Sequence, residues 1–506
     1  MFAADNQVSP TPPARRWRAA AGWWVTFLLG VMLYGLTANR GAQWQDSGYH
    51  ILRVVTHEVV NPLGLALSHP LHHYLARTLV SILPVEPCFA VTLASALAGA
   101  IAVANVFGCI VSLTGSRLSG AFGAASLAVA HTFWQMSTVA ETYTLAAALL
   151  SAECWCVSLF IKHRRQDWMV LAFLFNGAGV WNHMLAVLTT PVLILTAVLA
   201  SKFEIRISKK CILFGLGAWV WGAHPYLRLI LQQYQSSHDF WATLQSALFG
   251  NAYRNAVLNV SVSLSGLAIA CGFVVMNFPN LLLPFALFGA RSTQVPMLAR
   301  RALLAVVGIH AIFVLRYSVV DQHTFFVPMY AVLAILGGVG FAAARSWSWG
   351  KLVRGAAVLF LLATPILYAF LPAVARHYQV LQGRERHKPY RDDYVYVFTP
   401  WSVAETSADR MAREAVAQAG DGLLVVEDRM AEFAVKYVAR RAGNPLLRIV
   451  GPLEDRTIRD AARFPPNVVL VPKRSGVPLP VMEGCVWNPV GELYLLSCEK
   501  ELVHPD

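Results

Sequence analysis

The sequence predicts a polytopic α-helical membrane protein that ends in a small soluble α/β domain. Of its residues, 56% are hydrophobic and only 14% are charged, whereas soluble chains are about 25% charged. Apolar runs near 20 residues long recur along the chain, and this is the length that crosses a hydrocarbon layer as a helix. After Ala375 the sequence abruptly becomes charged. A large soluble core would explain the composition, but it would not explain the recurring run length.

The apolar runs predict about eleven membrane-spanning helices. We expect them near residues 19–38, 89–113, 118–136, 141–161, 168–182, 184–200, 211–230, 264–290, 302–317, 323–344 and 355–375. The first is expected to be an uncleaved anchor, because its apolar stretch exceeds the core of about 7–15 residues in a signal peptide. Between the first two spans lies a long loop, residues 39–88, in which 74–83 is typical of an interfacial amphipathic helix.

The basic residues predict the orientation, since Lys and Arg stay on the cytoplasmic side of short loops. They gather in alternate connections, as Arg15, Arg16, Arg18, Arg117, Lys162, Arg164, Arg165, Lys202, Arg206, Lys209, Lys210, Arg291, Arg300, Arg301, Arg345, Lys351 and Arg354. Residues 1–18 are therefore expected to be cytoplasmic and residues 376–506 periplasmic, in a bacterial inner membrane. The net charge of +13 is mostly this topology pattern, so membrane lipid is an expected partner and nucleic acid is not.

The C-terminal segment alternates strand and helix patterns. Strands are expected at 422–426, 447–450 and 467–472, and a helix at 430–441, which together indicate an α/β domain. The segment has no Gly-rich phosphate loop, so its expected role is structural or acceptor-handling. Cys485 and Cys498 flank a predicted hairpin, and both a disulfide and two free thiols stay open at this point.

Asp46 is the first candidate for chemistry. It stands in the sequence Trp-Gln-Asp-Ser-Gly-Tyr, residues 44–49, shortly after the first span. A carboxylate there would sit at the membrane surface beside a lipid-borne substrate, and ionisable groups at a membrane edge are costly unless they serve a function. The plain alternative is a solvated turn, because Asp-Ser-Gly is ordinary turn chemistry.

Histidines crowd the same loop, with three in five residues at His69, His72 and His73, and Arg77 follows. Three histidines could bind a metal ion, but no fourth ligand stands at a useful spacing. Polar contacts to a sugar or phosphate, or plain surface histidines, are favoured instead. We therefore predict no metal ligands and no certain cofactor, although a divalent metal ion stays open.

Further candidates lie at the expected outer ends of later spans. Glu141, His183 and Asp321 could face a substrate, or they could simply be favourable polar residues at helix ends. Arg228 and Arg316 depart from the positive-inside pattern. They are either snorkelling anchors or guanidinium groups that bind a lipid phosphate through a planar donor array.

The order of these motifs resembles a known family. After residues 44–48 come His-Pro-Leu at 69–71, Phe-Trp-Gln at 133–135, Ala-Glu-Thr-Tyr-Thr-Leu at 140–145, Asn-His at 182–183, His-Pro-Tyr-Leu-Arg at 224–228, and Asp321 followed by Phe-Phe-Val-Pro at 325–328. Over about residues 20–345 the chain is similar to a bacterial and eukaryotic family of GT-C superfamily membrane glycosyltransferases, whose animal member is a protein O-mannosyltransferase of the endoplasmic reticulum.

The resemblance implies an inverting transfer of a mannose-like sugar from a polyprenyl-phosphate carrier to an acceptor hydroxyl on a protein Ser or Thr or on a glycan. In this reading Asp46 is the general base, and one or more arginines stabilise the departing phosphate. The residues expected to bind substrate or phosphate are Arg77, Arg228, Arg316, His69, His73, Glu141, His183 and Asp321.

Two other functions stay open. In a secondary transporter, Glu153, His131 and His310 could form an intramembrane proton relay. The lack of an internal repeat, the long first loop and the appended soluble domain argue against that function. The third alternative is a non-catalytic, lipid-binding membrane scaffold.

Overall fold

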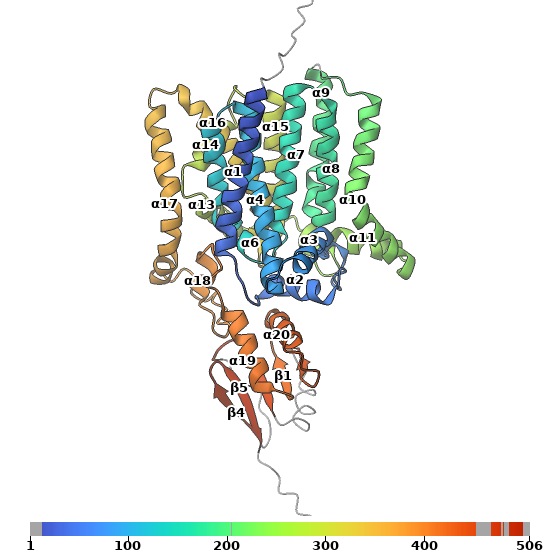
Figure 1. Ribbon diagram of the computed structural model, residues 1–506, viewed down its shortest axis with the longest axis vertical. Helices are drawn as coiled ribbons and strands as arrows, with labels where there is room; N and C mark the ends of the chain where they lie inside the picture. Colours follow the sequence, from blue (N-terminus) through green and yellow to red (C-terminus); the bar gives the residue numbers. More distant parts are fainter. Residues whose placement is uncertain (1–12, 204, 452–466, 477–478, 480–484, 499–506) are drawn as a thin grey trace, which may run out of the picture.

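The computed structural model describes residues 13–203, 205–451, 467–476, 479 and 485–498, so residues 1–12 of the predicted cytoplasmic N-terminus lie outside the described part. Figure 1 shows an upright helical bundle with a small sheet domain below one end. The bundle holds α1 (Pro13–Thr37), α2 (Gln45–Thr56), α3 (Pro70–Ile82), α4 (Pro87–Thr114), α5 (Arg117–Ala128), α6 (His131–Thr138), α7 (Tyr143–His163), α8 (Gln166–Asn182), α9 (Thr190–Ala200), α10 (Lys209–Ser237), α11 (Phe240–Phe249), α12 (Arg254–Leu258), α13 (Leu264–Asn277), α14 (Leu282–Gly289), α15 (Met297–Arg316), α16 (Val327–Ala343) and α17 (Gly350–His377). Short 3₁₀ turns are η1 (Leu65–Leu67), η2 (Met184–Leu188), η3 (Ser201–Phe203), η4 (Gln322–Phe326) and η5 (Ala344–Ser346).

The predicted count of about eleven spans is not confirmed. Among the described residues, seven helices are long and apolar enough to cross a membrane, or eight if α13 and α14, bent by 101°, form one broken span. The predicted spans 118–136, 168–182 and 211–230 are not among them. The first is broken between α5 and α6, α8 has only 17 residues, and α10 carries His224 and Arg228.

Helices α8 and α10 nevertheless run beside the spanning helices over the same height of the bundle (Figure 1). Glycines let the two helices approach closely, because a Cβ on Gly177 would lie 2.2 Å from the Trp219 carbonyl oxygen and one on Gly222 would lie 2.6 Å from that of Leu174. Small residues at a helix interface are a usual device of packing inside membranes. Helix length and apolar composition alone therefore give too few helices, because they leave out α8 and α10, which run beside the spanning helices.

The tail domain, which we define as α18 onward, carries a five-stranded sheet in the order β2-β1-β3-β5-β4. Strands β2, β1 and β3 are parallel, whereas β5 runs antiparallel to β3 and β4. Its elements are α18 (Asp393–Phe398), α19 (Ser407–Ala419), β1 (Leu423–Val426), α20 (Arg429–Ala442), β2 (Arg448–Val450), β3 (Val468–Val471), β4 (Cys485–Val490) and β5 (Leu493–Cys498). The predicted fold class, a helical membrane domain with a small α/β domain, is confirmed.

The sheet also bears on whether Cys485 forms a disulfide or stays a free thiol. Cys485 is disulfide-bonded, and the hairpin register sets it opposite Cys498.

The predicted domain boundaries at 375 and 376 stay a prediction.

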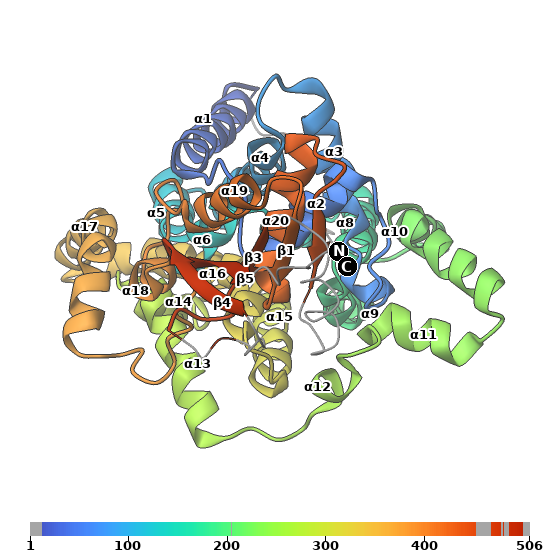
Figure 2. The same cartoon turned by 90° about the horizontal axis from the view of Figure 1, so that it is seen from below.

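Helices α19 and α20 form the face of the tail domain that meets the bundle (Figures 1 and 2). One buried apolar cluster joins α2 to both of them, with Ile51 and Val54 on one side and Val435 on the other. The Trp44 indole Nε1 donates to Ser407 Oγ at 2.7 Å, and the rings of Tyr49 and Phe433 lie 4.5 Å apart. The tail domain therefore packs directly on the helix that begins at Gln45.

Candidate active site

Three carboxyl groups from distant parts of the chain meet at the tail-facing end of the bundle. Asp46 lies in the first turn of α2, Glu141 in the break between α6 and α7, and Asp321 just before η4. Asp46 is exposed to solvent, although the surrounding protein still desolvates its carboxylate. Burial, and then the charge of Asp321, raises the pKa of Asp46 to about 6. Burial also raises the pKa of Asp321.

Glu141 is buried, and hydrogen bonds hold both its side chain and its backbone. Ser47 Oγ donates to its Oε1 at 2.8 Å, the Glu141 backbone N donates to Ser95 Oγ at 2.9 Å, and Ser95 Oγ donates to the Glu141 carbonyl at 2.7 Å. Burial and the nearby Asp46 charge raise the pKa of Glu141 to about 8. Glu141 is therefore mostly protonated at pH 7, whereas Asp46 is mostly ionised.

The backbone is strained where the chain enters this site. Gln45, with φ 57°, and His69, with φ 47°, adopt the left-handed conformation at the beginnings of α2 and α3. Residues other than glycine rarely take this conformation, and such strain persists only where the surroundings enforce it. Helices α2 and α3 both lie at the end of the bundle that faces the tail domain (Figure 1).

The predicted His69 and His183 lie in a cluster of histidine rings that also holds His50 and His72. The His69 ring lies 4.7 Å from that of His183 and 5.6 Å from that of His50, which lies 5.6 Å from His72. His69 Nδ1 is 2.9 Å from the Asn182 carbonyl, so this nitrogen carries the proton and donates. Burial lowers the pKa of His69 to about 4. The rings are therefore neutral at pH 7.

His73 is buried in α3, and its Nε2 has no hydrogen-bond partner among the residues that the structure describes. Within the described ranges, no group of three or more His, Cys, Asp and Glu side chains is arranged to hold a metal ion. The clustered rings offer flat faces and ring nitrogens, which suit contacts with a neutral polar ligand such as a sugar.

The predicted arginines are more scattered than the carboxyl groups. Arg77 on α3 and Arg228 on α10 are exposed, and their guanidinium groups make no hydrogen bond or ion pair with the described residues. Arg316 ends α15, and its Nε is buried with no hydrogen-bond partner in the described part of the chain. Arg316 is followed by Tyr317, whose pKa is raised by burial and then by the charge of Asp321.

Four site residues escaped sequence reasoning. Tyr253 and Tyr317 lie near the carboxyl groups, since burial and then the charges of Asp46 and Asp321 raise the pKa of Tyr253. Arg386 lies near Asp321, because its charge partly offsets the effect of burial on the pKa of that group. Arg53 is buried and donates to the carbonyl oxygens of residues 58, 59 and 68, which fixes the loop. No local motif marks these residues, and only long-range folding brings them here.

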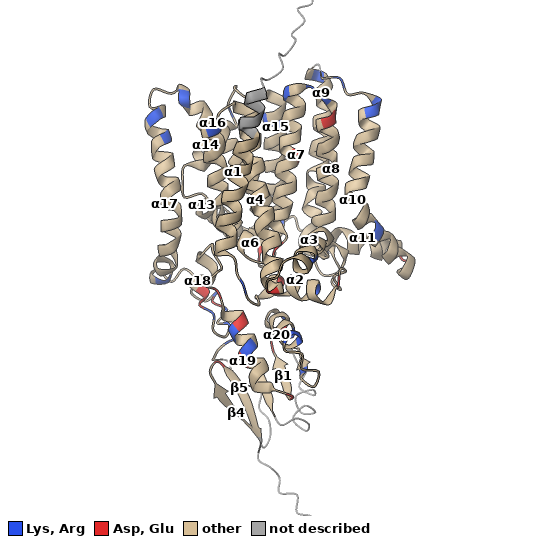
Figure 3. Ribbon diagram, in the orientation of Figure 1, with Lys and Arg blue, Asp and Glu red and all other residues tan. Residues whose placement is uncertain are grey.

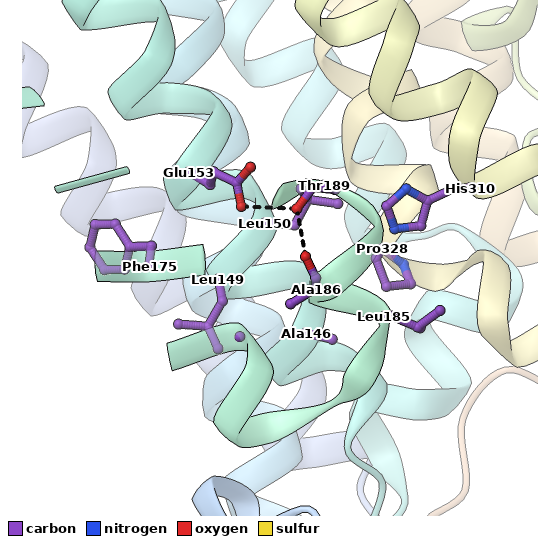
Figure 4. Close-up of a pocket in the computed structure, with 11 residues that line it drawn as sticks. Ala146, Leu149, Leu150, Glu153, Phe175, Leu185, Ala186, Thr189, His310 and Pro328 are labelled. Carbon is purple, nitrogen blue, oxygen red and sulfur yellow. Dashed lines mark hydrogen bonds between the residues drawn. The ribbon is translucent and has the colours of Figure 1, made fainter. Parts of the chain in front are cut away.

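The proposed proton-relay residues are not gathered in one place. Figure 4 shows a pocket inside the bundle that is lined by both Glu153 and His310. Glu153 Oε2 accepts from Asn176 at 3.0 Å and from Thr189 at 3.2 Å. His131 does not line this pocket, and its ring packs 5.2 Å from that of Tyr368.

Comparisons with known proteins agree with this architecture. A family model described as dolichyl-phosphate-mannose-protein mannosyltransferase matches residues 68–223, which is less than half of the chain. None of the curated proteins matches the chain. The crystal structure of ArnT from Cupriavidus metallidurans bound to undecaprenyl phosphate is similar, with a TM-score of 0.62 and 13% identity over 96% of this chain and 100% of that one. The same protein in the apo state gives a TM-score of 0.63 and 14% identity, with the same coverage of both chains.

These similarities show that the chain shares the fold of ArnT, a helical bundle with an appended sheet domain, over nearly its whole length. The identity of the sugar and of the acceptor is a separate question.

Proposed function

We propose that the protein moves a mannose-like sugar from a polyprenyl-phosphate carrier to an acceptor hydroxyl, on a protein Ser or Thr or on a glycan. The observation that carries this proposal is the meeting of Asp46, Glu141 and Asp321 at one end of a GT-C bundle. Two comparisons support a lipid-phosphate donor. The matching family model is described as a dolichyl-phosphate-mannose-protein mannosyltransferase, and ArnT was crystallised with undecaprenyl phosphate bound.

In the proposed reaction Asp46 removes the proton of the acceptor hydroxyl as its oxygen attacks the anomeric carbon. The new bond forms from the oxygen to that carbon, while the bond from the carbon to the phosphate oxygen breaks. The proton ends on Asp46, the electron pair leaves with the lipid phosphate, and the anomeric configuration inverts. An ionised carboxylate with a pKa of about 6 suits this task at neutral pH.

The other candidates take binding roles in this proposal. Protonated Glu141 donates a hydrogen bond to a sugar oxygen, and Asp321 accepts one from a sugar hydroxyl. Neutral His69, His73 and His183 line the sugar. The exposed Arg77 and Arg228 and the unpaired Arg316 Nε are available to phosphate oxygens at headgroup depth, because guanidinium groups bind phosphate through paired donors.

We also propose that this site faces the periplasm of a bacterial inner membrane, with the N-terminus cytoplasmic and the tail domain periplasmic. Figure 3 supports this orientation, since Lys and Arg gather at the connections on the end of the bundle away from the tail domain. Positively charged short loops remain on the cytoplasmic side. The site would then meet donors that have already been flipped across the membrane.

A direct assay tests the function. Purified protein in detergent or nanodiscs is supplied with radiolabelled polyprenyl-phosphate mannose and a panel of hydroxyl acceptors. We expect label to move to an acceptor and free polyprenyl phosphate to be released. Absence of transfer from any carrier sugar, together with solute uptake in proteoliposomes, would favour the transporter and contradict this proposal.

The pH dependence offers a second test. Because the base must be deprotonated, and burial and Asp321 raise the pKa of Asp46 to about 6, kcat/KM should fall about tenfold per pH unit below pH 6. In Asp321→Asn the loss of a neighbouring negative charge should lower this pKa. The fall in kcat/KM on the acid side of the pH profile should then begin at a lower pH. An unchanged profile would show that Asp46 is not the titrating base.

A further inference from the structure

Helix α11 reverses the usual pattern of a helix on a protein surface. Its apolar side chains point outward, since Phe240, Trp241 and Leu248 are 57%, 74% and 38% exposed. Two of its polar side chains, Thr243 and Ser246, are instead buried, and its ten residues include no charged one. A helix that faces water buries its apolar side and exposes its polar side. The pattern therefore indicates an apolar environment outside α11.

The inner face of α11 is bound to the first outer loop and to α10. The Leu65 backbone N donates to Ser246 Oγ at 3.0 Å, and Ser246 Oγ donates to Gln233 Oε1 at 3.0 Å. Just after α11, the Asn251 backbone N donates to the Leu63 carbonyl at 2.7 Å. Turning the apolar face of α11 toward the bundle would break these hydrogen bonds, so the bonds fix that face outward.

Helix α10 sets the height of α11 relative to the membrane. Figure 1 shows α10 running from the end of the bundle away from the tail domain toward the opposite end, where α11 begins. The 29 residues of α10 rise about 43 Å at about 1.5 Å per residue. A bilayer with its headgroups is about 40–45 Å thick. Helix α11 therefore begins near the headgroups of the leaflet on the tail-facing side.

Exposed aromatic rings cluster at the corner between α10 and α11. The Phe240 ring lies 5.2 Å from that of Trp241 and 6.4 Å from that of Tyr234, and all three are exposed. Tyr and Trp gather at membrane interfaces, where an apolar ring with a polar edge fits the headgroup level. The exposed apolar surface continues onto α10 at Leu231 and Trp221, and Figure 2 shows α11 at the periphery of the bundle.

We propose that α11 is an interfacial helix whose apolar face, Phe240, Trp241, Leu244 and Leu248, lies in the leaflet on the tail-facing side of the membrane. The partner is a lipid surface, because this face is uncharged, continues the exposed apolar side of α10 and lies at headgroup depth. The hydrogen bonds of the inner face then hold residues 63–65 of the first outer loop at that depth, shortly before His69. The placement of α11 does not depend on the proposed glycosyl transfer.

Spin labels on the full chain in nanodiscs test this placement. Trp241→Cys and Leu248→Cys carry the labels in a Cys271→Ala background, because Cys271 is the exposed thiol among the free cysteines of the described chain. Leu362→Cys, on the spanning helix α17, is the lipid reference, and Ala417→Cys, near the end of α19, is the water reference. We expect labels at 241 and 248 to collide more with oxygen than with a water-soluble nickel chelate, as at 362, and the opposite at 417.

The side chains of Trp241 and Leu248 are exposed, so the cysteine variants should keep the fold. More collisions with the nickel chelate than with oxygen at both positions would overturn the proposal, because α11 would then lie in water. Few collisions with either reagent would also overturn it, because a protein surface would then cover α11. Dipolar broadening between labels would identify that surface as a second copy of this chain.

Discussion

Replacing Asp46 with Asn is expected to reduce sugar transfer by about 10²–10⁴-fold, the usual contribution of a general base. The amide keeps the size of the side chain but cannot take the proton of the acceptor. The Asp46 carboxylate makes no hydrogen bond with another described residue and is repelled by the charge of Asp321. Membrane insertion, abundance and the unfolding midpoint should therefore be retained or slightly raised. Initial rates and thermal unfolding in detergent measure both expectations.

The matched control is Asp239→Asn. Asp239 is exposed and caps the beginning of α11, where its Oδ1 accepts from the Ala242 backbone N. Asparagine caps a helix nearly as well as aspartate, so transfer should be unchanged in this variant. Near-normal turnover in Asp46→Asn would remove Asp46 from the role of base. In that case Asp321 would be the next carboxylate to test, because Glu141 is mostly protonated at neutral pH.

Asp393→Ala is expected to have the largest effect on the fold around the site. It leaves the buried Arg391 guanidinium unpaired and removes the acceptor of two backbone N–H groups. Removing one partner of a buried ion pair costs about 3–5 kcal/mol. Because Arg391 packs over Trp44, just before α2, transfer should fall at least about tenfold together with the unfolding midpoint.

Arg376→Ala provides the comparison for this variant. Arg376 forms an ion pair with Asp392, one residue before Asp393, but the two side chains are 56% and 44% exposed. Exposed pairs are screened by solvent and contribute little to stability, so the midpoint and the transfer rate should barely change. If Asp393→Ala behaves like Arg376→Ala in both measurements, the ion pair of Asp393 with Arg391 does not hold α2 in place.

Local sequence patterns predicted most of the helices and the tail strands, because apolar run length and strand propensity are local properties. The bends were harder to place. The run 118–136 reads as one apolar span, yet it breaks after α5, and residues 264–290 form two helices bent by 101°. Whether the weakly apolar α10 lies beside spanning helices depends on its glycine contacts with α8, which composition does not report.

In the candidate site, too, some residues could be predicted from the sequence and others could not. Asp46, Glu141 and Asp321 stood out because carboxyl groups at the ends of apolar runs are unusual, and the fold brings all three together. Arg386 and Tyr253 did not stand out, because each lies in a segment that is polar for its own reasons. The placement of Arg386 is set by long-range contacts, since its backbone N donates to Asp393, and Arg391, the ion-pair partner of Asp393, packs on Trp44. Sequence reasoning therefore found the acids more readily than the cation beside them.

The most direct test of the central claim is a cryo-electron microscopy structure of the full chain with undecaprenyl phosphate in nanodiscs. We expect phosphate density at the tail-facing end of the bundle, beside Asp46 and Asp321. Density for the phosphate in the Glu153 and His310 pocket instead, with the carboxyl site empty, would contradict it.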